Sequence, residues 1–462
     1  MSQPRTLGEL RESGHRRETV KQELRRNLLQ RMRTREVLFP GIVGYDETVI
    51  PQIANAIISG HDVILLGERG QAKSRLMRTL TNLLDEVVPV VAGCEINDHP
   101  YDPICKRCRD LLAEHGDELE LGWLPRDRRY GEKLATPDIS IADLIGEVDP
   151  IKVAEGRYLA DELTIHYGLV PRTNRGIFGL NELPDLAERI QVGLLNIMEE
   201  KDVQIRGYRV RLPLDLMVVA SANPEDYTSR GRIITPLKDR FGSQVRTHYP
   251  LNASEEVAIM EGESAAHAPD VDVIVPTYMK EIVAEITQLA RRSPHISQSS
   301  GVSVRMSIGN YENLASNAIR RAVRLGEPLA VPRISDLAFL VASTAGRVEI
   351  EALDEGKEEQ VLGRIQRGAI SSVFGRYFSA SEFDRLVSKF EEGEMIEVGE
   401  NLPATAYEKA VPPAELRDAL ARLGLPDRPE ARASALEFVL EGLHLGKRLN
   451  KDELDGKAIF RR

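Results

Sequence analysis

The sequence lacks long apolar runs and a hydrophobic leader. In its 462 residues, no apolar stretch approaches the roughly 18 residues that a helix needs to span a bilayer. The first residues, MSQPRTLGEL, contain no hydrophobic region of the kind found in signal peptides. These absences argue against a membrane protein and against a secreted one. We therefore expect a cytoplasmic protein.

The sequence also lacks an excess of positive charge. Its formal net charge is −11, whereas nucleic-acid binding favours a basic field, so nucleic acid is not expected as the main partner. Residues 1–36 are an exception, with ten Lys or Arg against five Glu. In that segment Leu24, Leu28, Leu29 and Met32 fall near one helical face. Because glutamates are interleaved with the basic residues, we interpret it as a solvated amphipathic helix and not as a nucleic-acid arm.

What is present is the composition of an ordinary globular protein, with 42% apolar and 29% charged residues. Up to residue 255, short apolar runs alternate with helical patterns, and this predicts an α/β fold with a parallel sheet flanked by helices. Residues 88–130 are expected to be irregular. The later segments are predicted to be mainly helical up to the end of LEFVLEGLHLGKRLNKDEL.

The segment GERGQAKS, Gly67–Ser74, follows the apolar run DVILL and precedes a predicted helix. This is the context of a phosphate-binding loop, in which backbone N–H groups and the helix dipole hold phosphates. Lys73 would reach the β- and γ-phosphates, and the Ser74 hydroxyl would hold Mg²⁺. Ala72 stands where the pattern has its last glycine. We predict a negative φ at Ala72, where alanine would be harmless.

Two further strand ends carry polar residues that suit the same site. In GIFGLNE, Glu182 would act as general base, but Asn181 stands where an aspartate is expected to support Mg²⁺. An amide brings no negative charge to the ion, so an inactive, nucleotide-sensing ATPase stays open as an alternative. In SANP, Asn223 would contact the attacking water or the γ-phosphate.

With these motifs the chain resembles the AAA+ ATPases, and within them the magnesium-chelatase ATPase subunit and its MoxR relatives. The resemblance runs from LFPGIVGYDE into a helical lid, as far as about residue 345, and implies an ATP-hydrolysing enzyme with Mg²⁺. DLIGEVDPIKVAEGRYLADELTIHYGLVPRTNRG is similar to the insertion that divides the second helix of that group. In PLKDRFG, Arg240 would be an arginine finger that acts on a neighbouring subunit. In GVSVRMS, Arg305 would be a second phosphate contact. The nucleotide contacts that the resemblance implies are Ile42, Val43, Gly67, Glu68, Arg69, Gly70, Gln71, Ala72, Lys73, Ser74 and Arg75.

The resemblance also implies an organisation and partners. The expected divisions are a basic N-terminal helical extension (1–36), an AAA+ core (37–255) with a cysteine-bearing insert (90–130), a helical lid (256–375), and a linker with a helical C-terminal extension (376–462). A finger supplied in trans implies a homo-oligomer, a hexameric ring. No D-x-S-x-S motif is present, so a von Willebrand A-domain partner would be a separate protein. The work would be metal insertion into a tetrapyrrole or the remodelling of a protein.

Two other classes remain to be weighed. A transcriptional activator of the AAA+ type would need a G-A-F-T-G-A loop, which the sequence lacks, and the acidic chain argues against DNA reading. A non-hydrolysing nucleotide-dependent scaffold is motivated by Asn181.

The segment GCEINDHPYDPICKRC gathers potential metal ligands. Cys105 and Cys108 form a Cys-x-x-Cys pair, and Cys94 with His99 would complete a tetrahedral zinc site. Reduced free thiols and a redox switch are the alternatives, because a structural disulfide is not expected in a cytosolic protein.

Overall fold

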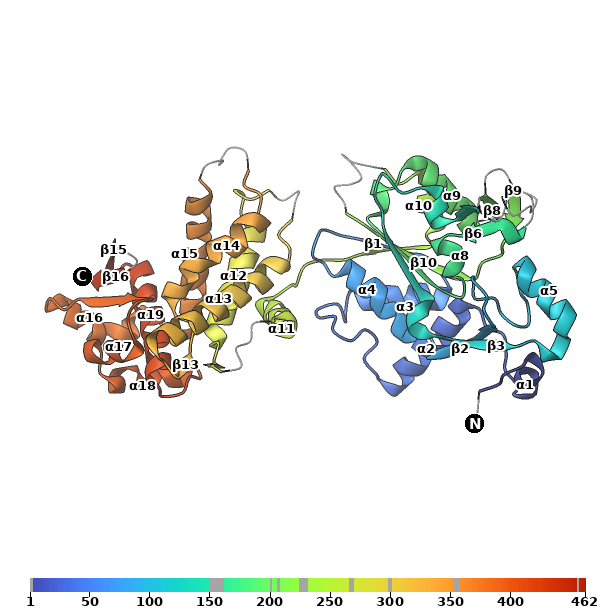
Figure 1. Ribbon diagram of the computed structural model, residues 1–462. Coiled ribbons are helices and arrows are strands. Elements are labelled where there is room, and N and C mark those ends of the chain that lie inside the picture. Colours follow the sequence, from blue (N-terminus) through green and yellow to red (C-terminus); the bar gives the residue numbers. More distant parts are fainter. Residues whose placement is uncertain are drawn as a thin grey trace. The chain divides into compact units, whose positions relative to one another are not determined.

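The computed structural model describes residues 3–149, 151, 154, 162–199, 202–205, 208–223, 232–265, 270–297, 301–351, 357–454 and 457–462. The chain forms two compact units, Met1–His248 and Tyr249–Arg462 (Figure 1). Each unit has its own hydrophobic core. Among the described residues, no helix is long and apolar enough to cross a membrane.

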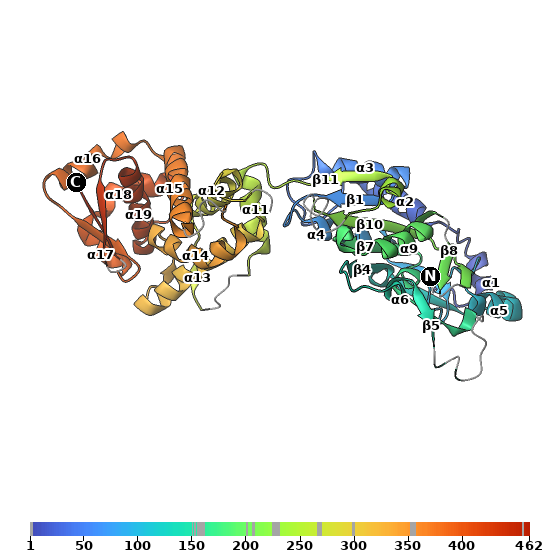
Figure 2. The same cartoon turned by 90° about the horizontal axis from the view of Figure 1, so that it is seen from above.

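The first unit is built on a five-stranded parallel sheet in the order β11-β1-β10-β7-β4 (Figure 2). Its strands are β1 (Val63–Leu66), β4 (Tyr130–Leu134), β7 (Gly176–Asn181), β10 (Leu216–Ala222) and β11 (Ser243–Arg246). The helices of this unit are α1 (Leu7–Glu12), α2 (Val20–Thr34), α3 (Val49–Ser59), α4 (Lys73–Thr79), α5 (Lys106–His115), α6 (Ile141–Leu144), α8 (Leu169–Arg172), α9 (Glu188–Glu199) and α10 (Thr235–Arg240). The predicted α/β fold with a flanked parallel sheet is confirmed.

Alternation along each strand supplies a separate core to each face of the sheet. In β1, Val63 and Leu65 pack into one core together with residues of α2, α3 and α4. Ile64 points to the opposite core, which contains residues of α9 and α10. Because both faces are covered, the strands are almost wholly apolar until they end. Polar side chains therefore collect at the carboxyl edge of the sheet.

Helix α2 is tied to the core by a buried ion pair. Arg129 donates two hydrogen bonds of 2.6 Å to the Glu23 carboxylate, and both side chains are almost fully buried. Leu24 and Leu28 are buried, as the predicted amphipathic face requires, whereas Met32 is 48% exposed. The basic N-terminal segment is thus a structural part of the first unit.

The cysteine-bearing segment is ordered, and the expectation of an irregular stretch over 88–130 was wrong. Strands β2 (Val87–Val91) and β3 (Leu121–Pro125) pair antiparallel, with α5 between them in the sequence. Helix α4 ends at Thr79 and continues as a 3₁₀ turn, Leu80–Leu83. Long-range pairing of β2 with β3 is what the local pattern could not reveal.

Two further antiparallel pairs belong to the first unit. Strands β5 (Gly146–Val148) and β6 (Ile165–Tyr167) pair, as do β8 (Asp202–Ile205) and β9 (Tyr208–Arg211). In the sequence, DVQIRGYRVRLPL has the alternating pattern of a hairpin that turns near Gly207. The pair β8–β9 is this hairpin, and positions 206–207 lie outside the described residues. Much of the predicted helix-dividing insertion, between Pro150 and Asp161, also lies outside them.

The second unit is mainly helical, with a large core that joins the predicted lid to the C-terminal segment and a smaller cluster that contains Ala318, Ala322 and Ala330. Its helices are α11 (Ala253–Glu263), α12 (Thr277–Arg292), α13 (Arg305–Leu325), α14 (Val341–Thr344), α15 (Glu358–Tyr377), α16 (Asp384–Glu391), α17 (Ala404–Ala410), α18 (Pro413–Arg422) and α19 (Pro429–Leu445). Its strands are β12 (Asp272–Val273), β13 (Leu329–Ala330), β14 (Ile396–Gly399), β15 (Asn450–Leu454) and β16 (Lys457–Arg461).

The end of the chain differs from the sequence-based expectation of a continued helix. Helix α19 ends at Leu445, and the residues after it form the hairpin β15–β16, which pairs with β14. Strand β16 pairs with β14, a segment about sixty residues earlier, and Phe460 is buried in the core of the unit, so long-range pairing that helical periodicity does not reveal sets the conformation of this tail.

Candidate active site

The loop Gly67–Ser74 connects β1 to α4 at the carboxyl edge of the sheet. Gly67 is required there by close packing, because a Cβ at this position would lie 1.9 Å from the Thr247 hydroxyl oxygen. Gly70 has a φ of +77°. Helix α4 begins at Lys73, so the first N–H groups of the helix face the loop. The strand, glycine loop and helix have the order that the motif predicted.

Ala72 adopts the left-handed conformation, with φ 54° and ψ 18°. The prediction of a negative φ was therefore wrong. The loop must reverse direction immediately before α4, and the left-handed region makes this turn at a cost of about 1 kcal/mol for a residue with a Cβ. The side chain is exposed, so the cost is conformational and not a clash.

Lys73 is buried and its ammonium group lies inside the loop. Nζ donates to the carbonyl oxygens of Gly67 at 2.5 Å and Glu68 at 2.8 Å. It also donates to Oδ1 of Asn223 at 2.7 Å, so residues from two neighbouring strand ends meet at this cation. A buried positive charge held by oxygen acceptors is a suitable phosphate-binding group.

The side chain of Gln71 stabilises the loop through hydrogen bonds. Its Oε1 accepts hydrogen bonds from the Glu68 N–H at 3.1 Å and from the Thr247 hydroxyl at 2.7 Å. The Tyr45 hydroxyl donates to the Gln71 carbonyl oxygen at 2.9 Å, and burial raises the pKa of Tyr45 to about 12. Ile42 and Val43 are partly buried in the same segment as Tyr45, so this segment is anchored to the loop.

Asn181 stands at the end of β7 and contacts the loop directly. Its Oδ1 accepts hydrogen bonds from the hydroxyls of Ser74 at 3.0 Å and Ser221 at 3.2 Å. The structure thus brings together the two residues that the sequence suggested for Mg²⁺. The amide oxygen is the group that faces Ser74, which leaves Asn181 Nδ2 to act as a donor elsewhere.

Glu182 follows in a left-handed conformation with a φ of 56°. Such a conformation is uncommon for a residue with a side chain, and it is a pointer to a functional position. The Glu182 Oε2 atom accepts a hydrogen bond of 2.6 Å from Asn223 Nδ2. Asn223 therefore connects the carboxylate to the ammonium group of Lys73.

Sequence reasoning missed Glu132, which lies on the neighbouring strand β4. Asn181 Nδ2 donates a short hydrogen bond to Glu132 Oε1, and Arg78 donates two more, at 2.7 and 2.9 Å. Partial burial opposes ionisation, but the Arg78 guanidinium outweighs it and holds the pKa of Glu132 below its usual value. A carboxylate thus lies one side chain away from Ser74. YGEKL carries no clear strand pattern in the sequence, and the position of Glu132 beside Asn181 follows only from the pairing of β4 with β7.

The predicted arginines lie on two different units. Arg240 ends α10, is 43% exposed and pairs with Glu199 of α9. Arg305 begins α13 in the second unit and is exposed. Within the loop region, Arg75 is exposed and lies against the backbone of Gly41. Their roles toward phosphate stay predictions.

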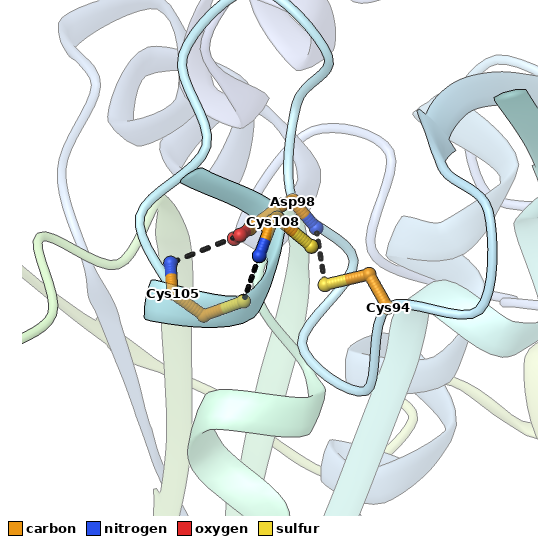
Figure 3. Close-up of side chains that lie close together, drawn as sticks. All are labelled: Cys94, Asp98, Cys105 and Cys108. Atoms are coloured by element: carbon orange, nitrogen blue, oxygen red, sulfur yellow. Dashed lines mark hydrogen bonds between the residues drawn. The ribbon is translucent and has the colours of Figure 1, made fainter. Parts of the chain in front are cut away.

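The structure brings three of the four predicted zinc ligands together. Cys94, Cys105 and Cys108 lie with Asp98 in one cluster, whereas His99 is not part of it (Figure 3). His99 Nδ1 accepts the Tyr101 N–H at 3.0 Å, and its ring stacks on His15. Burial lowers the pKa of His99 to about 3. The ligand set that included His99 is not the one that the geometry supports.

Comparisons with known proteins agree with the motifs. No family model matches the sequence. Magnesium-chelatase subunit ChlI of Nostoc sp. is 29% identical over 271 residues, which cover 56% of this chain and 66% of the relative. The chloroplastic ChlI of Nicotiana tabacum is 30% identical over 243 residues, which cover 51% and 53%. The chain therefore spans about half to two thirds of the length of these relatives.

Among solved structures, one match is a chain of the BchI–BchD complex of magnesium chelatase, which was built on a cryo-EM reconstruction. The match covers 69% of the present chain and 98% of the BchI–BchD chain, with 18% sequence identity and a TM-score of 0.35. That likeness is too weak to support a functional conclusion. The chain is similar in sequence to magnesium-chelatase ChlI subunits over about half of its length, and this similarity agrees with the loop and the strand-end residues described above.

Proposed function

We propose that the chain is a motor subunit that binds and hydrolyses ATP. The observation that supports this most strongly is the convergence of Lys73, Ser74, Asn181, Glu182 and Asn223 at one edge of the sheet. The hydrogen bonds Lys73–Asn223 and Ser74–Asn181 join residues more than a hundred positions apart in the sequence. The hydrogen bond between Asn223 and Glu182 joins the ends of two different strands. The five residues are of the types that a nucleoside triphosphate site needs.

Phosphate binding would fall to the loop and the start of α4. The backbone N–H groups of the loop would cradle the phosphates, and the Lys73 ammonium would contact the β- and γ-phosphates. Lys73 is already held by two loop carbonyls and by Asn223, so phosphate oxygens would take over part of that hydrogen-bonding role.

Hydrolysis would use the pair Glu182 and Asn223. A water molecule attacks the γ-phosphorus in line, Glu182 accepts its proton, and the bond to the bridging oxygen of ADP breaks. The products are ADP and inorganic phosphate. The Asn223 amide that now donates to Glu182 would position that water or the γ-phosphate.

The residues present fit Mg²⁺. Ser74 and Asn181 supply the oxygen atoms for the ion, which would neutralise charge on the phosphates. Glu132 would contribute the negative charge that an aspartate supplies elsewhere, acting through its hydrogen bond with Asn181. This contact favours an active ATPase over the non-hydrolysing scaffold that Asn181 alone suggested.

The larger assembly belongs to the same proposal. The half-exposed Arg240 would reach ATP on a neighbouring subunit of a hexameric ring, with Arg305 of the lid as a further phosphate contact. By analogy with the chelatase relatives, the ring would act with a separate von Willebrand A-domain protein. The outcome would be metal insertion into a tetrapyrrole or remodelling of a protein partner, in the cytoplasm.

The experiment that tests this function is a steady-state ATPase assay with Mg²⁺ on the wild type, Lys73→Ala and Glu182→Gln. We expect phosphate release by the wild type and its loss in both variants, with each variant folded by circular dichroism. An unchanged rate in both variants would assign the activity to a contaminant. Absence of wild-type turnover despite ATP binding would favour the scaffold.

A further inference from the structure

Three thiols and one carboxylate gather beside the nucleotide-binding sheet, outside the residues used for ATP. Cys94 and Asp98 lie in the turn that follows β2, whereas Cys105 and Cys108 lie at the start of α5 (Figure 3). Asp98 and Cys108 are fully buried, and Cys105 is 5% exposed. The cluster therefore lies in the segment 92–105, which joins β2 to α5, and in the first turn of that helix.

The spacing of the four groups fits one small ion. One ligand atom from each residue lies within 4.8 Å of all the others. In a tetrahedral zinc site with Zn–S bonds of about 2.3 Å, the sulfur atoms are about 3.8 Å apart. A modest contraction of the turn would bring the cluster to that geometry.

One oxygen atom of the buried Asp98 carboxylate lacks a hydrogen-bond partner, which is an independent indication of a bound ion. Its Oδ2 accepts the Cys105 N–H at 2.9 Å, but its buried Oδ1 has no hydrogen-bond partner. A buried carboxylate oxygen is costly unless it is hydrogen-bonded or bound to a metal. Within the described residues, the cysteine sulfurs are the groups gathered around this carboxylate.

Two of the sulfur atoms accept hydrogen bonds from backbone N–H groups, as metal-bound cysteines commonly do. The Asp98 N–H donates to Cys94 Sγ at 3.3 Å, and the Cys108 N–H donates to Cys105 Sγ at 3.4 Å. Cys105 also caps the ten-residue helix α5, whose N-terminus favours negative charge. Arg107 lies 4.0 Å from Cys108 Sγ. N–H donors of this kind are common outer-shell partners of metal-bound sulfur.

We propose that Cys94, Asp98, Cys105 and Cys108 bind one Zn²⁺ in a closed structural site. Binding releases the three thiol protons to solvent and leaves the sulfur atoms as thiolates. Three thiolates and one carboxylate fill a tetrahedral shell, so no position is left for substrate, and the soft sulfur donors favour zinc over Mg²⁺ or Ca²⁺.

Zinc bound here would stabilise the segment that leads into β7, the strand that ends at Asn181. Asn97, inside the metal-binding turn, donates to the Arg172 carbonyl at 2.8 Å, and Asn174 donates to the Ile96 carbonyl at 2.9 Å. These contacts join the turn to the residues that immediately precede β7. Loss of zinc is therefore expected to lower the thermal stability of the first unit more than it changes the chemistry at Glu182.

The first test uses the full-length wild type purified without oxygen or chelator. We expect about one zinc per chain by elemental analysis, three thiols titratable after denaturation, and, on cobalt replacement, the intense visible bands of tetrahedral thiolate coordination. A chain that holds no zinc and gives no cobalt spectrum overturns the proposal. A disulfide within the anaerobic protein overturns it as well and favours a redox switch.

A matched pair of variants then tests the ligand set. Asp98→Asn keeps the shape of the side chain and is expected to weaken zinc binding by about tenfold or more, by loss of a ligand charge. His99→Gln, one residue away, is expected to bind as the wild type does. The reverse result would replace Asp98 by His99 in the site. The cobalt spectrum of the wild type decides the presence of a metal site even when a variant fails to fold.

Discussion

Replacing Ala72 by glycine should stabilise the first unit. The residue is held at φ 54° and is exposed, so removal of the methyl group relieves left-handed strain without opening a cavity. The relief is about 1 kcal/mol, and the greater freedom of glycine in the unfolded chain returns about half of it. We expect a net gain of about 0.5 kcal/mol, or about 1–2 °C in the unfolding midpoint of a unit of this size.

The assay can be restricted to that unit, because the single tryptophan of the chain, Trp123, lies on β3. Urea unfolding followed by its fluorescence should show a higher midpoint for Ala72→Gly. The matched control is Ala113→Gly, which is exposed within helix α5 and should lower the free energy of unfolding by about 1 kcal/mol. If both variants were destabilised alike, residue 72 would not be left-handed and the description of the loop would be wrong.

Further predictions concern Glu132, the carboxylate beside the proposed Mg²⁺ position, and helix α2. Glu132→Gln should raise the Mg²⁺ concentration for half-maximal ATP turnover by about tenfold, and adding Asn181→Asp should reverse this, whereas an unchanged Mg²⁺ requirement would remove Glu132 from the site. Glu23→Gln leaves the buried Arg129 guanidinium without its charge partner and should cost about 3–5 kcal/mol in urea unfolding. Glu18→Gln, which breaks an exposed pair, should cost less than about 1 kcal/mol; equal losses would contradict the anchoring role of the buried pair.

The phosphate loop could be predicted because its signal is local. The strand before Gly67, the loop and the helix from Lys73 are contiguous in the sequence, and the residues Asn181, Glu182 and Asn223 each end an apolar run. Parallel strands bring such ends to one edge whatever the exact register. The meeting of these residues at one edge of the sheet could therefore be predicted from the fold class, without knowledge of side-chain geometry.

Glu132 could not be predicted in the same way. Its strand lies beside β7 only through a pairing between segments about fifty residues apart, with the cysteine-bearing segment placed before it. The sequence shows Asn181 as a defect in the motif. The structure shows that the amide bridges Ser74 and a carboxylate, and this arrangement depends on the register of two strands.

Two other differences come from backbone geometry. Whether Ala72 has a positive φ depends on how sharply the chain must turn into α4, which residue type alone does not determine. In the metal-binding turn, Asp98 and His99 are adjacent in sequence but point to different surroundings, since the chain places the carboxylate among the sulfurs and the imidazole against His15. The prediction for the tail was wrong because β14 pairs with β16 of the hairpin β15–β16, across about sixty residues of sequence.

The central claim is that Glu182 activates water for an ATP held by Lys73. The most direct test measures ATP binding and phosphate release in parallel for Glu182→Gln, at saturating Mg²⁺ and ATP. We expect an ATP affinity within about threefold of the wild type and a turnover reduced by about a hundredfold or more, the range expected when a general base is removed. Turnover equal to that of the wild type, with ATP bound, would contradict the assignment of Glu182 as the catalytic base.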